Sequence, residues 1–261
     1  MAHLGLLLTH NEIDVIEEYL EATLPYFDGV FALDHSDDGT FDVLSSYPKV
    51  LRIFRQNEVA PQGICDADRQ ILLDAARKAF GPGHWYALLH ADEFFYHNPR
   101  IVAEQAEAEG AHWVNWIALQ FFFHPQDQDR PLWEIPSVQD RLQWYSPLWV
   151  EVRQFRDRPQ AAYRPGEHRR VIPRGIGWRP YSKAPVLFHY PYRSPDQFAA
   201  KRKNPGFSDS FNDPELFRPT FQPAYRRAYS RAQGLGPFEH PQPLWRLLFW
   251  RWRYLDPRRL G

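Results

Sequence analysis

Short hydrophobic runs alternate with helix-like patterns through the first half of the chain. The strand-like runs lie at 4–9, 29–33, 50–54, 85–89 and 112–123. Between them, apolar residues recur at helical spacing in segments that begin at Ile13, near Phe41 and at Ile64. Strands that alternate with helices are typical of a mostly parallel sheet flanked by helices. The pattern therefore predicts an α/β fold.

The clearest predicted helix lies between Ile64 and Gly81. One face of this helix is apolar except at Asp68. Asp66 stands at the expected N-cap position, and a Gly-Pro-Gly stretch that starts at Gly81 ends the helix. Arg69 lies in the first turn, where the positive end of the helix macrodipole disfavours a cation. A diphosphate bound at this turn would remove the conflict. Local neutralisation by the two aspartates explains the same arginine without any ligand.

The second half of the chain is less regular, because 19 of the 24 prolines follow residue 124. We predict short strands at 150–155, 170–172 and 186–189 and a helix at 195–203. The segment 243–255 is rich in Trp and Arg, which predicts a helix that packs on the domain or contacts an anionic membrane. We expect the chain to divide into the parts 1–124, 125–205 and 206–261.

Composition excludes several classes of protein. The chain has 261 residues, of which 44% are hydrophobic, and this is enough for a substantial core. Its one cysteine, Cys65, excludes an internal disulfide and a cysteine-based zinc site. The chain has neither a signal-like N-terminus nor an apolar run of about 18 residues. We therefore expect a cytoplasmic protein that is at most peripheral to a membrane.

Charge is distributed unevenly along the chain. Residues 1–150 contain 9 Lys and Arg against 23 Asp and Glu, whereas residues 151–261 contain 22 against 9. An acidic half suits a divalent cation or sugar hydroxyls, and a basic half suits phosphates or an anionic surface. Simple attraction between the two halves is an equally open interpretation.

Polar clusters follow three of the predicted strands. They are Thr9-His10-Asn11-Glu12, the segment 34–40 and the segment 90–93. In open α/β sheets, ligands bind beyond the carboxyl ends of the strands, where loops and helix N-termini converge. Each cluster alone is explained by a helix cap, a turn or a solvated strand end. Their occurrence at successive strand ends favours a common binding site.

The order of these clusters resembles the family-2-like GT-A nucleotide-sugar glycosyltransferases. The matching residues are Asn11-Glu12, Asp34-His35-Ser36-Asp37-Asp38-Gly39-Thr40, His90-Ala91-Asp92-Glu93-Phe94-Phe95 and the later segment 188–194. The resemblance covers about residues 3–124. It implies a GT-A fold with a nucleotide-sugar-binding half at 1–124 and an acceptor-binding and site-closing half at 125–205. We expect a helical or loop extension at 206–261.

The resemblance also implies an activity and a set of site residues. The activity is inverting transfer of a sugar from a nucleoside-diphosphate sugar, a UDP-sugar foremost, to a carbohydrate or glycan hydroxyl, assisted by Mn²⁺ or Mg²⁺. Asp92, His189 and His90 are the metal candidates, although His90 replaces the first acid of the family motif. The candidates for nucleotide and phosphate binding are Thr9, Glu12, Asp34, Asp37, Arg69 and Arg193.

The catalytic base must lie in the acceptor half, where it can remove the proton of the acceptor hydroxyl. Asp140 and Glu134 are the candidates, because Trp133 and Trp144 flank them and sugars stack on aromatic faces.

Three other functions remain possible from the sequence. A nucleotidyltransferase would share the sheet, the acidic residues and the arginines, but it would usually carry a Gly-rich phosphate loop after the first strand, which is absent here. A carbohydrate-binding module would explain the 16% aromatic content, but it needs no Asp34, Arg69 and Asp92 at successive strand ends. The near-neutral net charge of −1 disfavours nucleic-acid binding.

Overall fold

A computed structural model describes residues 1–55, 66–122, 132–142, 144–164, 171–194, 197, 230–231 and 242–243. The strands are β1 (His3–Thr9), β2 (Gly29–Asp34), β3 (Val50–Arg55), β4 (Trp85–His90), β5 (Glu93–Phe95), β6 (Trp113–Phe122), β7 (Trp144–Arg156), β8 (Lys183–Ala184), β9 (Val186–His189), β10 (Ser230–Arg231) and β11 (Gln242–Pro243). The α-helices are α1 (Ile16–Thr23), α2 (Thr40–Ser46), α4 (Arg69–Phe80), α5 (Pro99–Ala108) and α6 (Val138–Arg141). Shorter 3-10 helices are η1 (Leu24–Tyr26), η2 (Asp66–Asp68) and η4 (Leu132–Glu134).

The main sheet is mixed rather than mostly parallel. Its order is β3-β2-β1-β4-β7-β6-β9-β5, with β10 also paired to β7, and a separate small sheet pairs β8 with β11. The first four strands of this order are parallel, as predicted, but β7 runs antiparallel between β4 and β6. The prediction of a mostly parallel sheet is therefore wrong for the second half of this strand order. There, β7 lies antiparallel beside β6, and an antiparallel connection needs no helical crossover.

Strand direction brings the polar strand ends to one edge of the sheet. Because β6 and β9 run parallel to β1, the carboxyl ends of β1, β2, β4, β6 and β9 share that edge. Strand β5 is antiparallel to β9, so β5 begins at the same edge. The expected clusters after β1, β2 and β4 are thus gathered in one region.

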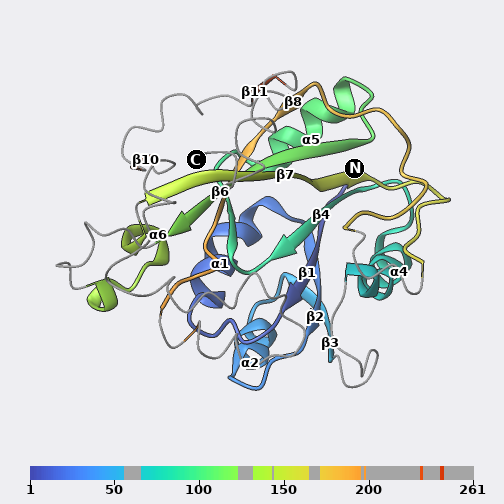
Figure 1. Cartoon of the computed structure of the whole chain (residues 1–261). Coiled ribbons are helices and arrows are strands. Elements are labelled where there is room, and N and C mark those ends of the chain that lie inside the picture. The colour runs from blue at the N-terminus through green and yellow to red at the C-terminus, as the bar shows by residue number, and fades with distance from the viewer. Residues whose placement is uncertain are drawn as a thin grey trace.

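Helices cover both faces of the sheet (Figure 1). Successive side chains of a strand point to opposite faces. In β1, Leu7 therefore joins the core cluster that contains Leu20 of α1, whereas Leu6 joins the cluster that contains Leu72 of α4. A third cluster packs α5 against Trp116 of β6. The strand β1 is consequently buried along its whole length and provides a rigid support for the residues that follow it.

The helix at α4 begins later than the sequence pattern predicts. Asp66 belongs to the 3-10 turn η2, and Asp68 occupies the N-cap position without a capping side-chain hydrogen bond. The predicted N-cap at Asp66 is therefore wrong, because the chain forms a tighter turn before the helix starts at Arg69. The predicted end is confirmed, since Gly81 follows α4 with a φ of 81°, a left-handed conformation that favours glycine.

The later predictions have mixed outcomes. The strand at 186–189 is confirmed, whereas the one at 150–155 is part of the 13-residue strand β7. Pro147 interrupts the β7 pattern and lies beside a register shift, the usual place for a proline in a sheet. Val171 and Ile172 form no strand.

Other predictions lie wholly or mostly outside the described residues. The predicted helix at 195–203 is described only at residue 197, and the segment 243–255 only at residue 243. Helix α5 was not predicted, although Asn98 caps it and Pro99 opens it. In the described part of the chain, no helix has the length and apolar character needed to cross a bilayer.

A buried histidine at the start of β1 makes stability depend on pH. The geometry assigns the His3 proton to Nδ1, which donates to the Tyr26 carbonyl at 3.0 Å, while Nε2 lies 2.9 Å from the Gln154 amide nitrogen. Burial lowers the pKa of His3 to about 4, and the positive charge of Arg100 adds to the shift. The unfolded chain therefore binds the proton more tightly than the folded chain.

The free energy of unfolding should fall as pH decreases. The contribution of neutral His3 is complete above pH about 6.5 and is lost towards pH 4, by about 3 kcal/mol. Urea unfolding at several pH values measures this loss. We expect His3→Gln to remove that component of the pH dependence, and an identical slope in wild type and variant would contradict the assignment.

Candidate active site

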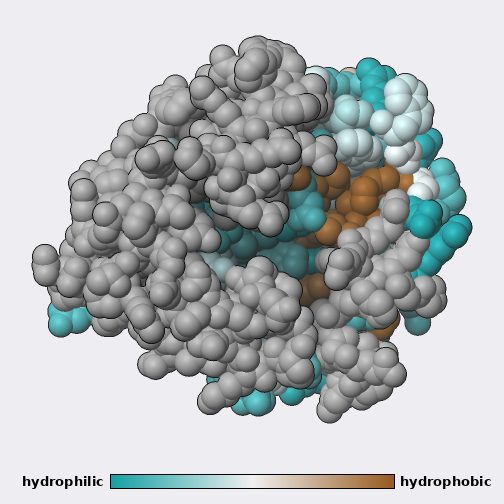
Figure 2. All heavy atoms as spheres, viewed as in Figure 1, coloured by the Kyte–Doolittle hydropathy of each residue, from teal (hydrophilic) through white to brown (hydrophobic). Residues whose placement is uncertain are grey.

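The candidate site lies at the switch in strand order between β1 and β4. From β1 the chain passes to β2 and β3 on one side and then returns to place β4 on the other side of β1. Loops diverge at such a point and leave room for a ligand beyond the carboxyl ends of the strands. On the face seen in Figure 2, the described residues near the centre are hydrophilic, with a hydrophobic area beside them.

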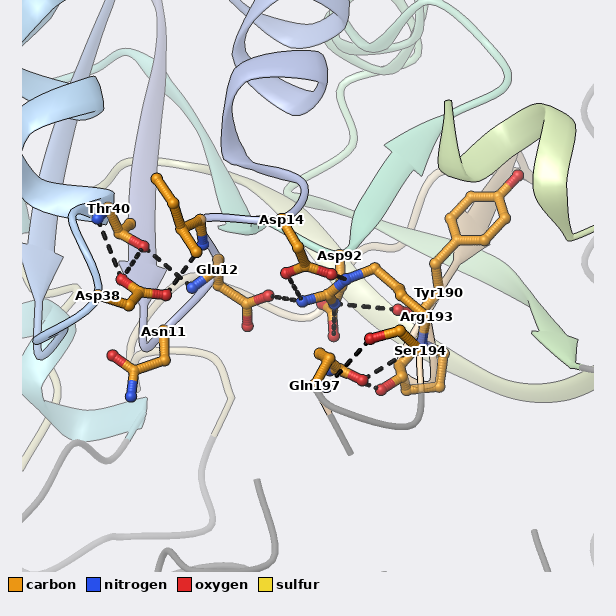
Figure 3. Close-up of polar contacts among 12 residues, drawn as sticks. Asn11, Glu12, Asp14, Asp38, Thr40, Asp92, Tyr190, Arg193, Ser194 and Gln197 are labelled. Carbon is orange, nitrogen blue, oxygen red and sulfur yellow. Dashed lines mark hydrogen bonds and ion pairs between the residues drawn. The ribbon is translucent and has the colours of Figure 1, made fainter. Parts of the chain in front are cut away.

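The loops after β1 and β2 are fastened to each other. Asn11, which has a φ of 54°, accepts a hydrogen bond from the Asp37 backbone N–H at 2.9 Å and donates its own N–H to Ser36 Oγ at 2.9 Å. The Glu12 backbone N–H donates to Thr40 Oγ1 at 3.0 Å (Figure 3). Asp37 itself is exposed. The Asn-Glu and Asp-to-Thr elements thus form one structural unit.

Asp34 is fully buried at the centre of this unit. Its Oδ1 accepts hydrogen bonds from Thr9 Oγ1 at 2.9 Å and Ser36 Oγ at 2.6 Å, and its Oδ2 pairs with Arg55 Nη1 at 2.9 Å. The Arg55 side chain is 34% exposed and lies over the Phe41 ring. Arg55 was not predicted, although the β2–β3 register places it opposite Asp34. Asp34 therefore orients Arg55, the member of this group that reaches solvent.

Arg193 joins the segment after β9 to the loop after β1 (Figure 3). Its Nε and Nη2 donate to the two carboxylate oxygens of Asp14 at 2.8 Å each, and Nη2 also pairs with Glu12. Nη1 donates to the Tyr190 carbonyl at 3.1 Å. Burial disfavours the charge, but Glu12, Asp14 and Asp92 outweigh it and raise the pKa of Arg193. These contacts make Arg193 a permanent cation that holds carboxylates together, and its predicted phosphate contact stays a prediction.

Asp92, Glu93 and His189 form the candidate metal site, with ligand atoms within 4.8 Å of one another. The register of β5 and β9 pairs Glu93 with His189, which explains how residues far apart in the sequence meet. His189 Nε2 lies 3.6 Å from Asp92 Oδ2, too far for a hydrogen bond. The Asp92 and His189 side chains are 13% and 17% exposed, so both remain accessible to a ligand.

Glu93 is held by a buried arginine. Arg153 donates from Nε and Nη2 to the two Glu93 carboxylate oxygens at 2.7 and 2.6 Å. Arg153 occupies a register shift, because Val114 pairs with Gln154 while Asn115 pairs with Val152. Such irregularities redirect side chains. Glu93 is thus already neutralised, and Asp92 and His189 are the better-placed ligands of the group.

His90 contacts Arg69 instead of the acidic group. Arg69 Nη2 lies 2.8 Å from His90 Nε2, and Arg69 is fully buried in the first turn of α4. Burial, together with the charges of Arg69 and Arg153, lowers the pKa of His90 well below its ordinary value. A neutral imidazole accepting from the guanidinium is therefore the stable arrangement. The predicted third metal residue, His90, stands beside the site, and Glu93 occupies the third position of the group.

The two candidate bases lie in different surroundings. Asp140 is exposed on α6, whose first residues are capped by Glu18 through Ser137 Oγ at 2.7 Å and the Val138 backbone N–H at 2.9 Å. The next residue, Arg141, donates to the Arg193 carbonyl at 3.2 Å, so α6 adjoins the site. Glu134 is exposed on η4, and no described contact links it to this region. The Trp133 and Trp144 side chains lie outside the description.

The site carries excess negative charge among the described residues. Six carboxylates gather around four guanidiniums, namely Glu12, Asp14, Glu18, Asp92, Glu93 and Glu151 around Arg69, Arg141, Arg153 and Arg193. Buried charges are stable when they are paired or coordinate a metal. A divalent cation would balance this group, which makes the donor set chemically suitable for one.

Comparisons with known proteins give only remote similarity. No protein-family model and no curated protein sequence matches the chain. Among solved structures, it resembles glucosyl-3-phosphoglycerate synthase from Mycobacterium tuberculosis in complex with Mn²⁺ and UDP, with 16% identity, 49% of this chain and 47% of that chain covered, and a TM-score of 0.30.

Two further solved structures are similar at the same level. Mannosyl-3-phosphoglycerate synthase from Rubrobacter xylanophilus has 18% identity, coverage of 52% and 44%, and a TM-score of 0.34. A structure assigned to a glucose-1-phosphate thymidylyltransferase from Bacillus anthracis has 15% identity, coverage of 48% and 57%, and a TM-score of 0.29. The chain spans about half the length of these proteins.

Proposed function

We propose that this protein is a metal-dependent glycosyltransferase that moves a sugar from a nucleoside-diphosphate sugar to a hydroxyl acceptor. The proposal rests mainly on the Asp92-Glu93-His189 group at the switch point between β1 and β4. This position is where α/β sheets bind nucleotides. The family resemblance of the strand-end motifs adds inversion and a UDP-sugar donor to the proposal.

Asp92 and His189 would hold the divalent cation. When bound, it would neutralise the charge that develops on the departing nucleoside diphosphate. The imidazole of His189 favours Mn²⁺ over Mg²⁺, because Mg²⁺ prefers oxygen ligands. Glu93 supports the site through its buried pair with Arg153 and keeps β5 in place.

Other residues of the chain would bind and orient the donor and the acceptor. Arg55 reaches solvent beside the fastened β1 and β2 loops, where it can bond the nucleoside. Arg69 at the first turn of α4 is proposed to face the diphosphate, with neutral His90 holding its guanidinium. Asp140 on α6 is the better-placed proposed base, since α6 is attached beside Arg193. It would accept the proton of the acceptor hydroxyl.

Nucleotide-dependent stabilisation tests the proposed function. We expect one of the nucleoside diphosphates UDP, GDP and dTDP to raise the unfolding temperature in the presence of Mn²⁺. Ligand at a hundred times its dissociation constant adds about 2.7 kcal/mol to the free energy of unfolding. Asp92→Asn should lose the Mn²⁺-dependent part, whereas Asp42→Asn, at an exposed position of α2, should keep it.

The outcome distinguishes the proposal from its competitors. Stabilisation by a nucleoside triphosphate together with a sugar 1-phosphate, but by no diphosphate, would indicate nucleotidyl transfer instead. Stabilisation by sugars alone would indicate a carbohydrate-binding protein. No response to any nucleotide with either metal would contradict the proposal.

A further inference from the structure

A loop at the end of the sheet opposite the candidate site exposes a tryptophan side chain to solvent. Trp178 is 83% exposed and is the most exposed large hydrophobic side chain among the described residues. Its neighbours on either side, Ile176 and Tyr181, are buried. The chain therefore leaves the core after Ile176 and returns to it at Tyr181, with Trp178 exposed between these two buried residues. Exposing so large an apolar ring stabilises nothing within the fold.

The loop is fixed in this conformation. The Trp178 backbone N–H donates to His112 Nδ1 at 3.1 Å, and the His112 backbone N–H donates to the Arg179 carbonyl at 2.7 Å. Gly177 has a φ of 101°, and a Cβ atom there would lie 2.1 Å from His112 Nδ1. Both the left-handed backbone and the close approach require glycine. Trp178 is consequently held at the surface by the backbone of its own loop.

Two arginines accompany the exposed tryptophan. A Cβ atom at Gly177 would lie 2.7 Å from Arg158 Nη1, which places that guanidinium against the loop, and Arg179 directly follows Trp178. After burial, the charges of Arg158 and Arg179 are the causes that lower the pKa of His112, so both face this point. Within the described ranges, neither guanidinium forms an ion pair with a carboxylate. Their positive charge is therefore available to a partner.

We propose that Trp178, Arg158 and Arg179 form a docking surface for an anionic lipid bilayer. Tryptophan rings settle at the headgroup level of membranes, and arginines near the surface are attracted by anionic lipids. The surface lies where the parallel strands begin, since Pro180 bridges to Trp113 and the start of β4 pairs with the end of β7. The candidate site lies at the other end of these strands, so a docked protein keeps that site open to soluble substrates.

Vesicle flotation of the 261-residue chain tests this surface without donor or metal, so its result is independent of the proposed activity. We expect binding to phosphatidylcholine vesicles that contain phosphatidylglycerol, weak binding to phosphatidylcholine alone, and release at high salt. Each arginine replaced by glutamine should lower partitioning about five-fold, so Arg158→Gln with Arg179→Gln should lower it roughly 25-fold. Trp178→Ala should also lower partitioning onto the vesicles, whereas Trp178→Tyr should keep most of the wild-type partitioning.

A matched control separates this surface from general changes. Ile101→Ala removes a half-exposed apolar side chain on α5 and should leave vesicle binding unchanged. Circular dichroism would establish that each variant is folded, as expected for substitutions at the surface. Equal binding of wild type and the Trp178→Ala, Arg158→Gln, Arg179→Gln variant would overturn the proposal. Binding to an anionic polysaccharide but not to anionic vesicles would also overturn it.

Discussion

Asp92→Asn is expected to reduce sugar transfer at least ~100-fold while leaving the fold intact. Asparagine keeps the size of the side chain but removes the anionic ligand, and a bound cation contributes several kcal/mol to stabilising charge in a transition state. Asp92 is partly exposed and lies 4.0 Å from Arg193, whereas Glu12 and Asp14 make the close contacts with that guanidinium and are retained in the variant. The loss should appear in kcat rather than in the unfolding temperature of the free protein.

Steady-state kinetics with and without EDTA measure this effect. Wild type should lose activity in EDTA and recover it when Mn²⁺ is restored, with a smaller recovery in Mg²⁺. Asp42→Asn, with the same chemical change at an exposed position of α2, should behave as wild type. Full activity in EDTA, or an Asp92→Asn enzyme as fast as wild type, would mean that arginines alone neutralise the leaving group.

Arg153→Met is expected to lower the free energy of unfolding by about 3–5 kcal/mol, because it leaves Glu93 as a buried charge without its bidentate partner. Both side chains of this pair are buried, and Arg153 also pairs with Glu151 at 2.7 Å. Removing both charges should be less damaging than removing one. The double variant Arg153→Met, Glu93→Gln should therefore recover a large part of the lost stability.

Urea unfolding of the two single variants and the double variant gives the coupling energy of the pair. A double variant that loses as much as the sum of the single variants would contradict direct coupling. The single loss also has a functional consequence. Because Arg153 neutralises Glu93 beside Asp92 and His189, Arg153→Met should free that carboxylate and strengthen Mn²⁺ binding by the folded variant.

The first half of the fold was predictable from sequence because its signals are local. The strands β1, β2 and β4 are buried, mostly apolar runs, and the turn residues after β1 and β2 mark where those strands end. The rule that parallel strands direct their carboxyl ends to one edge then brings the Asp34 and Asp92 clusters to the same side of the sheet. This part needed no knowledge of long-range contacts.

The remainder of the site depends on pairings that the sequence does not display. Arg153 reaches Glu93 because of a register shift between β6 and β7, and no local pattern indicates such a shift. Asp14 reads as an ordinary residue before α1, yet it binds Arg193 almost 180 positions later. Arg55 was the missed residue with a usable signal, because it ends a predicted strand next to the one that ends at Asp34.

Electron-spin-echo spectroscopy of the Mn²⁺-loaded protein tests the proposed metal site, because it detects a nitrogen nucleus bonded to the metal. We expect modulation from an imidazole nitrogen in wild type, its loss in His189→Gln and its retention in His90→Gln, since His90 Nε2 is engaged by Arg69. Asp92→Asn should weaken Mn²⁺ binding in parallel. No nitrogen modulation in wild type, or a signal lost in His90→Gln but kept in His189→Gln, would contradict the proposed metal site.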